Sequence, residues 1–175
     1  MSRTYWHVIG DDVHAGMMLN NTRLRKGMLW TGEIMRQILG PLQSKHMIIS
    51  PYATFNTQPQ KEKIWEDIRL SEYPNLPSRR EALFLFETKD DLERASQKWW
   101  PGRPRRCLQA VVQQGFVHKA DACLLDCFEP EWPDKARAYW SGGRTADPLF
   151  EVVVQGAIYF PEWETFPMLF PPPQP

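Results

Sequence analysis

Short runs of β-branched and aromatic residues recur along this chain, but helix-type segments do not separate them at regular intervals. TYWHVI at 4–9 and ALFLF at 82–86 have the composition and the length of strands. A parallel sheet needs a helical crossover between neighbouring strands, and this order of segments lacks that alternation. The sequence therefore predicts an α+β protein with mainly antiparallel sheets.

Four further strands are expected in the second half of the chain, at 106–113, 115–125, 150–154 and 157–160. Gly115 marks a turn between the first two of these strands. Gln155-Gly156 marks a hairpin-like turn between the last two.

Four segments have the apolar spacing and the end signals of helices, at 32–39, 59–69, 88–100 and 133–140. Thr31 is the expected N-cap of the first, and Gly40-Pro41 ends it. Thr88 is the expected N-cap of the third. The segment 11–21 is predicted to be a loop.

The length of 175 residues suits one compact domain, predicted over residues 1–163. Six of the sixteen prolines lie from position 161 onward, so residues 164–175 are predicted to form an extended Pro-rich tail.

Charge and cysteine content restrict the partners and the compartment. Lys+Arg and Asp+Glu both total 21, and this balance disfavours a protein that coats nucleic acid or an anionic membrane. The sequence has no apolar stretch of 18 residues and no signal-type N-terminus, so we expect no membrane partner. Three cysteines suit a reducing compartment, and a cytoplasmic location is expected. Cys123 and Cys127 with His118 do not make a recognisable zinc set, so no metal is expected.

Three separated blocks together resemble the ADP-ribosyltransferase superfamily. They are YWHV at 5–8, ALFLFETKDDLERASQKWW at 82–100 and LFEVVVQGAIYF at 149–160. The His in the first block resembles the branch that includes poly-ADP-ribose polymerases and diphtheria toxin. The blocks PSRREALFLF, ARAYWSGG and FEVVVQGAIY resemble more closely a small bacterial and phage group of that superfamily. The resemblance implies a core of two packed, mainly antiparallel sheets with short flanking helices.

The resemblance also implies an activity, the transfer of ADP-ribose from NAD, which serves as cosubstrate, to a macromolecular acceptor. Breaking the bond between nicotinamide and ribose spreads positive charge over the sugar, and a fixed carboxylate stabilises that charge. Glu151 matches the family's catalytic Glu. His7 matches the residue that holds the adenosine ribose, and Val8 the backbone that binds the nicotinamide amide. Both are therefore expected in the NAD site, with His7 also counted among the catalytic residues.

Three more residues are expected to contact NAD. Family members of this branch usually place a Tyr on the helix after the second core strand. This chain has Trp99 there, and Tyr139 on another helix, so either ring is a candidate to stack on nicotinamide. Arg79, just before the second core strand, is the candidate for the pyrophosphate.

The acceptor is left open between a protein side chain and a nucleic acid. Leu149 stands where arginine-modifying members carry Glu or Gln, which disfavours arginine as the acceptor. Arg103, Arg105 and Arg106 could contact the phosphates of a nucleic acid. The family context suggests a toxin or effector, with an antitoxin or immunity protein as a possible partner.

The alternative is a non-catalytic module on the same fold that binds a nucleotide or a partner protein. A cleft faced by both His7 and Glu151 would favour the enzyme. A filled cleft, or a His7 that points into the core, would favour the module.

Overall fold

The computed structural model describes residues 3–10, 13–32 and 59–166. Its strands are β1 (Thr4–Ile9), β2 (Met28–Trp30), β3 (Leu83–Leu85), β4 (Arg106–Asp121) and β5 (Phe150–Tyr159). Every strand pairing is antiparallel, and the described strands form one five-stranded sheet in the order β1-β4-β5-β2, with β3 paired to β5. The predicted α+β class is confirmed, whereas the strands lie in one sheet where two were expected.

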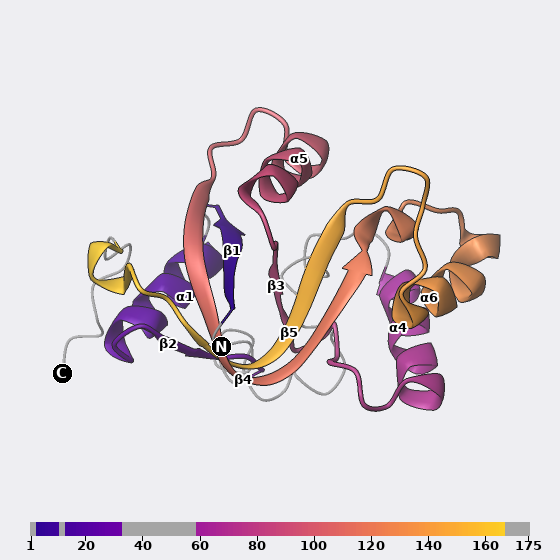
Figure 1. Cartoon of the computed structure of the whole chain (residues 1–175), viewed down its shortest axis with the longest axis horizontal. Helices are drawn as coiled ribbons and strands as arrows, with labels where there is room; N and C mark the ends of the chain where they lie inside the picture. The colour runs from indigo at the N-terminus through magenta and orange to yellow at the C-terminus, as the bar shows by residue number, and fades with distance from the viewer. Residues whose placement is uncertain (1–2, 11–12, 33–58, 167–175) are drawn as a thin grey trace.

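The sheet bends sharply at two glycines that face each other across β4 and β5. Gly115 pairs with Gly156, and their φ angles are +136° and +158°. A Cβ on Gly156 would lie 2.0 Å from the carbonyl oxygen of Gln114, and one on Gly115 would lie 2.3 Å from that of Gln155. Only glycine permits this approach. Figure 1 shows the result, a long two-stranded ribbon bent into a V.

The two turns predicted at these glycines are therefore wrong. β4 runs unbroken through Gly115, with a bulge between Val112 and Gln114, and β5 runs unbroken through Gly156. Each glycine breaks the local pattern as a turn residue does, but the break marks a bend in a continuous strand.

The bend divides the sheet into two arms. β1 pairs with residues 106–111 of β4, and β2 pairs with residues 157–159 of β5, so both lie in one arm. β3 pairs with residues 152–154 of β5 in the other arm. Trp6 and Phe86 exchange two backbone hydrogen bonds of 2.8 and 2.7 Å, which joins β1 to the end of β3 and curls the sheet.

The helices are α1 (Val13–Leu24), α4 (Pro59–Glu72), α5 (Lys89–Trp99) and α6 (Trp132–Ser141). The last three confirm predicted helices, and Thr88 caps α5 as expected, its hydroxyl accepting a 3.0 Å hydrogen bond from the Asp91 backbone N–H. α1 contradicts the loop predicted at 11–21. The helix predicted at 32–39, with its Thr31 cap, falls almost entirely outside the described residues. The Thr31 hydroxyl accepts a 2.7 Å hydrogen bond from the Gly156 N–H.

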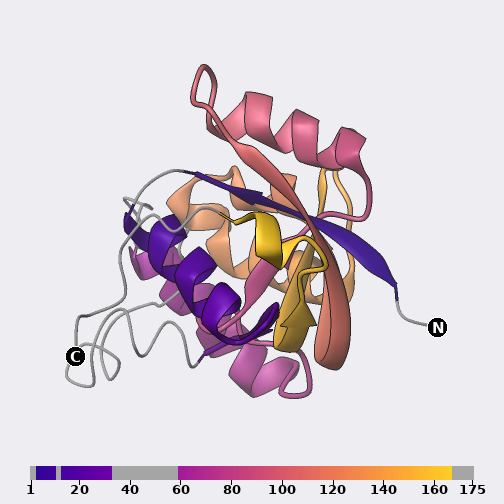
Figure 2. The same cartoon turned by 90° about the vertical axis from the view of Figure 1, so that its left-hand side faces the viewer.

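Each helix group covers a separate part of the core. α1 packs by Leu19 against the arm that holds β1 and β2, and α4 and α6 pack by Trp65 and Trp140 against the other arm (Figure 1). α5 packs by Leu92 and Ala95 over Val8 and Phe86, and Figure 2 shows it across the top of the curled sheet.

The start of the predicted tail belongs to the folded body. Phe166 is buried against Phe160, and Arg23 donates 2.8 Å hydrogen bonds to the carbonyls of Glu164 and Phe166. Residues 167–175 lie outside the described part. Among the described helices, none combines the length and the apolar character needed to cross a membrane.

Candidate functional site

Arg79, Tyr139 and Glu151 meet in one buried polar cluster, together with Glu62. Arg79 Nη1 donates to Oε1 of Glu151 and, at 2.6 Å, to the Tyr139 hydroxyl. The Tyr139 hydroxyl in turn donates to the same Oε1 at 2.5 Å. On its other side, Arg79 donates from Nε and Nη2 to the Glu62 carboxylate at 3.1 and 3.2 Å. Each of these four residues is buried, with at most 3% of its surface exposed.

Four different elements bring these side chains together. Glu151 is the second residue of β5 and pairs with Ala120 of β4, while Tyr139 extends from α6 and Glu62 from the first turn of α4. Arg79 lies in the turn that leads into β3. Its guanidinium lies 4.8 Å from the Phe84 ring centroid and 5.1 Å from that of Tyr139, so two aromatic rings fix its plane.

The cluster sets one guanidinium against two carboxyl groups. Burial acts to lower the pKa of Arg79, but the charges of Glu62, Tyr139 and Glu151 outweigh burial and raise that pKa well above its ordinary value. Burial also raises the pKa of the Tyr139 hydroxyl well above its ordinary value, so Tyr139 stays a hydrogen-bond donor. Both of these donors use Oε1 of Glu151, and Oε2 accepts no hydrogen bond from any described residue. One oxygen of this carboxylate is therefore held and the other is unused.

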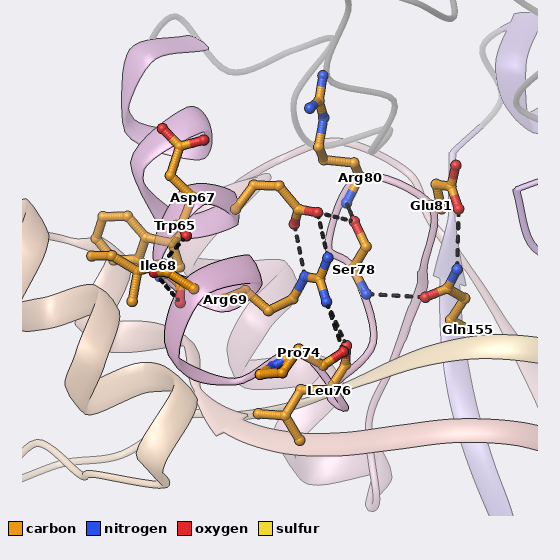
Figure 3. A network of polar contacts seen from close by, with 12 residues as sticks. Trp65, Asp67, Ile68, Arg69, Pro74, Leu76, Ser78, Arg80, Glu81 and Gln155 are labelled. Carbon is orange, nitrogen blue, oxygen red and sulfur yellow. Dashed lines mark hydrogen bonds and ion pairs between the residues drawn. The ribbon is translucent and has the colours of Figure 1, made fainter.

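A second polar network fixes the turn that carries Arg79 (Figure 3). Arg69 donates to both oxygens of Glu66, at 3.1 and 2.7 Å, and to the Leu76 carbonyl at 2.9 Å. The Ser78 hydroxyl donates to Glu66 at 3.0 Å, and the Ser78 backbone N–H donates to Gln155 Oε1 at 3.1 Å. Because Ser78 directly precedes Arg79, these bonds set where the guanidinium enters the cluster.

His118 is the histidine beside the cluster. It lies on β4, half-buried, with Nε2 3.1 Å from the Tyr139 carbonyl oxygen and its ring 5.3 Å from that of Trp140. Burial lowers the pKa of His118, and the charge of Arg79 lowers it further. The imidazole is therefore mostly neutral at pH 7.

His7 does not join this cluster. It shares its face of β1 with Tyr5 and Ile9, which pack in the core around Phe160, and its ring contacts Phe160 edge-on at 6.2 Å. Glu151 shares its face of β5 with Val153, which packs beneath α4 and α6. The two side chains therefore lie on different faces of the sheet.

The surroundings of His7 are those of a core residue. Its side chain is 7% exposed, and Nδ1 lies 2.9 Å from the Phe84 carbonyl. Since a carbonyl can only accept, Nδ1 carries the proton. Burial lowers the pKa of His7 to about 4, against the opposing effect of this hydrogen bond, so the ring is neutral at pH 7.

Val8 and Trp99 also lie apart from the Glu151 cluster. Val8 is buried under α5 with Leu92, and Trp99, half-buried at the end of α5, packs edge-on against Trp100 at 5.8 Å. Three of the six residues predicted for the site are therefore in contact with one another, and the other three are not part of that contact.

Glu62 is the residue that sequence reasoning missed. It lies on α4 in line with Glu66 and Arg69, at spacings of four and seven, and all three are buried beside Trp65. Charged residues in a helix are usually solvated, so this stripe reads as the outer face. The sequence signal that could have identified this stripe is its position next to the apolar residues Trp65 and Ile68 around the helix.

The described residues include no group of three or more His, Cys, Asp or Glu side chains placed to hold a metal ion. A family model described as "Protein of unknown function (DUF2441)" matches residues 33–163, which is more than half of the chain. No curated protein matches the chain.

Proposed function

We propose that this chain, which belongs to the DUF2441 family, transfers ADP-ribose from NAD to a macromolecular acceptor, with Glu151 as the catalytic carboxylate. This proposal includes the ADP-ribosyltransferase-like core. The bent antiparallel sheet with helices on both arms is compatible with that core.

One observation carries the proposal. The resemblance places Arg79, Tyr139 and Glu151, from three distant parts of the sequence, in one NAD site, and their side chains bond to one another. These contacts join residues that are 60 and 72 positions apart in sequence.

The geometry suggests a role for each member. Glu151 Oε2 would face the ribose, where its negative charge stabilises the positive charge that develops as nicotinamide leaves. Arg79 and Tyr139 hold Oε1 and orient the carboxylate. They are therefore positioning residues in this proposal, in place of the pyrophosphate contact and the nicotinamide stacking expected from the resemblance.

The NAD contacts expected of His7, Val8 and Trp99 find no support in this arrangement. All three nitrogens of the Arg79 guanidinium already donate to Glu62, Tyr139 or Glu151, and His7 Nδ1 is used by Phe84. The proposal consequently assigns no NAD contact to these residues, and the one contact with NAD that it names is that of Glu151.

A label-transfer assay tests this function. The protein is incubated with a cell lysate and NAD that carries a label on its adenine half, and the labelled product is treated separately with protease and nuclease. Glu151→Gln keeps the size of the side chain and removes its charge, so we expect transfer to fall at least a hundredfold, as for removal of other electrostatic groups at reacting centres. Glu93→Gln, on the exposed face of α5, is the matched control. Equal transfer by wild type and Glu151→Gln would sink the proposal.

The second candidate is a non-catalytic module, and two observations favour it. Glu151 is 3% exposed and already paired, and His7 points into the core. Such a module would bind NAD or ADP-ribose, measurable by titration calorimetry, without releasing nicotinamide. Release of nicotinamide that depends on Glu151 would exclude it.

A further inference from the structure

The connection between α5 and β4 lies in a basic stretch of the chain. Residues 94–120 contain six Arg and Lys and no Asp or Glu, in a protein whose total charge is zero. Three of the six, Arg103, Arg105 and Arg106, fall within four residues. Figures 1 and 2 both show this connection standing out from the body.

Within the described part of the chain, the three arginines have no acidic partner. Arg103 and Arg106 are exposed, Arg105 is half-buried, and no carboxylate of the described residues forms an ion pair with any of them. By contrast, Arg94 and Lys98 on the preceding helix are paired with Asp147 and Asp126 at 2.8 and 2.6 Å. Glu93 and Glu162, which act on the pKa of Cys107 near the start of β4, form no ion pair with the arginines either.

Trp100 holds the central guanidinium in place. Arg105 lies over the Trp100 ring at 4.7 Å from its centroid, and its buried Nε has no hydrogen-bond partner. The backbone around it is restrained by Pro101 and Pro104, and by a hydrogen bond from the Arg103 N–H to the Trp100 carbonyl at 3.2 Å. A restrained connection loses little entropy on binding an anion.

We propose that this connection, residues 99–106, is a binding surface for single-stranded nucleic acid. Three arginines within four residues can contact phosphates of one strand, and the planar guanidinium of Arg105 beside Trp100 offers a surface on which an unpaired base can stack. An acidic peptide would pair with the charges of the arginines but would offer no base to stack on the Arg105 guanidinium. A patch of three arginines in a neutral protein contacts a few phosphates, which is compatible with its balanced charge. The surface does not depend on activity at Glu151.

Fluorescence anisotropy without NAD tests the surface, with a labelled 12-nucleotide single strand, its duplex and a poly-glutamate competitor. Three phosphate contacts predict a slope of about −2 in log affinity against log salt, so affinity should fall about 20-fold between 50 and 200 mM NaCl. Replacing Arg103, Arg105 and Arg106 by Ala should weaken binding at 50 mM more than tenfold and flatten that slope. Replacing Lys63, Lys135 and Arg137, which form ion pairs elsewhere on the surface, by Ala removes the same charge and should leave binding within twofold.

Arg105→Lys separates stacking from charge, because Lys keeps the charge and loses the planar group. We expect it to bind several-fold more weakly with the salt slope unchanged. Retention of circular dichroism and melting temperature shows that each variant is folded, and the exposed single substitution Arg103→Glu replaces the triple variant if that one is unfolded. Equal loss in the two triple variants, tighter binding of the duplex, or displacement of the strand by poly-glutamate at equal charge concentration would each overturn the proposal.

Discussion

The Arg79 cluster predicts a large loss of stability when its single cation is removed. Arg79→Met keeps most of the side-chain length but leaves Glu62 and Glu151 facing each other with no positive charge nearby. Breaking a buried ion pair in this way costs about 3–5 kcal/mol, because a buried charge is left uncompensated. In a chain of this length each kcal/mol lowers the melting temperature by about 2–4 °C, so a fall of roughly 6–20 °C is expected.

Urea denaturation at pH 7, followed by tryptophan fluorescence, measures this loss. The eight tryptophans include Trp65 and Trp140 in the core under α4 and α6, so the signal reports on the affected region. Arg137→Met is the control, since Arg137 is half-exposed and pairs with Glu72 on the surface. That surface pair contributes only about 0–1 kcal/mol.

A third variant tests whether charge is the cause. Arg79→Met combined with Glu62→Gln and Glu151→Gln removes the unpaired charges that the single substitution leaves. If the loss is electrostatic, this variant unfolds at a higher urea concentration than Arg79→Met alone. The reasoning is refuted if Arg79→Met costs no more than Arg137→Met, or if neutralising the two carboxyls recovers nothing.

Two other predictions concern the core and the bend. The pKa of His7 is about 4 in the folded protein and about 6.5 in the unfolded chain. The neutral ring therefore contributes fully to the free energy of unfolding above pH 6.5. This contribution is lost as the pH falls toward 4, by about 3 kcal/mol in total. His7→Asn should remove that part of the acid sensitivity in urea unfolding series run from pH 7 to 4, and parallel wild-type and variant curves would contradict it. Gly156→Ala should lower stability by more than 2 kcal/mol, because its Cβ would meet the Gln114 carbonyl at 2.0 Å. Gly102→Ala, at φ +72° with nothing within 4 Å, should lose only about 1 kcal/mol, and equal losses would show that the close approach is unimportant.

The elements that sequence patterns predicted best are those whose signals are local. α5 is specified by its Thr88 cap and by Leu92 and Ala95 on one face, and β1 by its run of β-branched and aromatic residues. α1 was missed because Gly16, Asn20 and Asn21 are weak helix formers. Its stability comes from the burial of Leu19 against the sheet, which is a tertiary effect.

The bend could not be predicted because its cause is the partner strand. Gly115 and Gly156 each resemble a turn when considered alone, and only their pairing across β4 and β5 shows that both belong to continuous strands. The same limit applies to the site. Glu151 and Arg79 were selected from sequence patterns, but Glu62 enters the cluster through the packing of α4 against α6.

The continuity of β4 and β5 through the bend makes the two arms a single cooperative unit. Each arm contains one half of the β4–β5 pair. Neither arm therefore has a complete set of paired strands that could be expressed as a fragment. Amide hydrogens on both sides of Gly115 should therefore exchange by the same global opening, and one apolar cluster, which joins Leu83 and Val154 of one arm to Leu29 and Leu108 of the other, supports this. We expect a proteolytic cut near the bend to unfold the whole chain, and a cut in a surface connection to leave the chain folded.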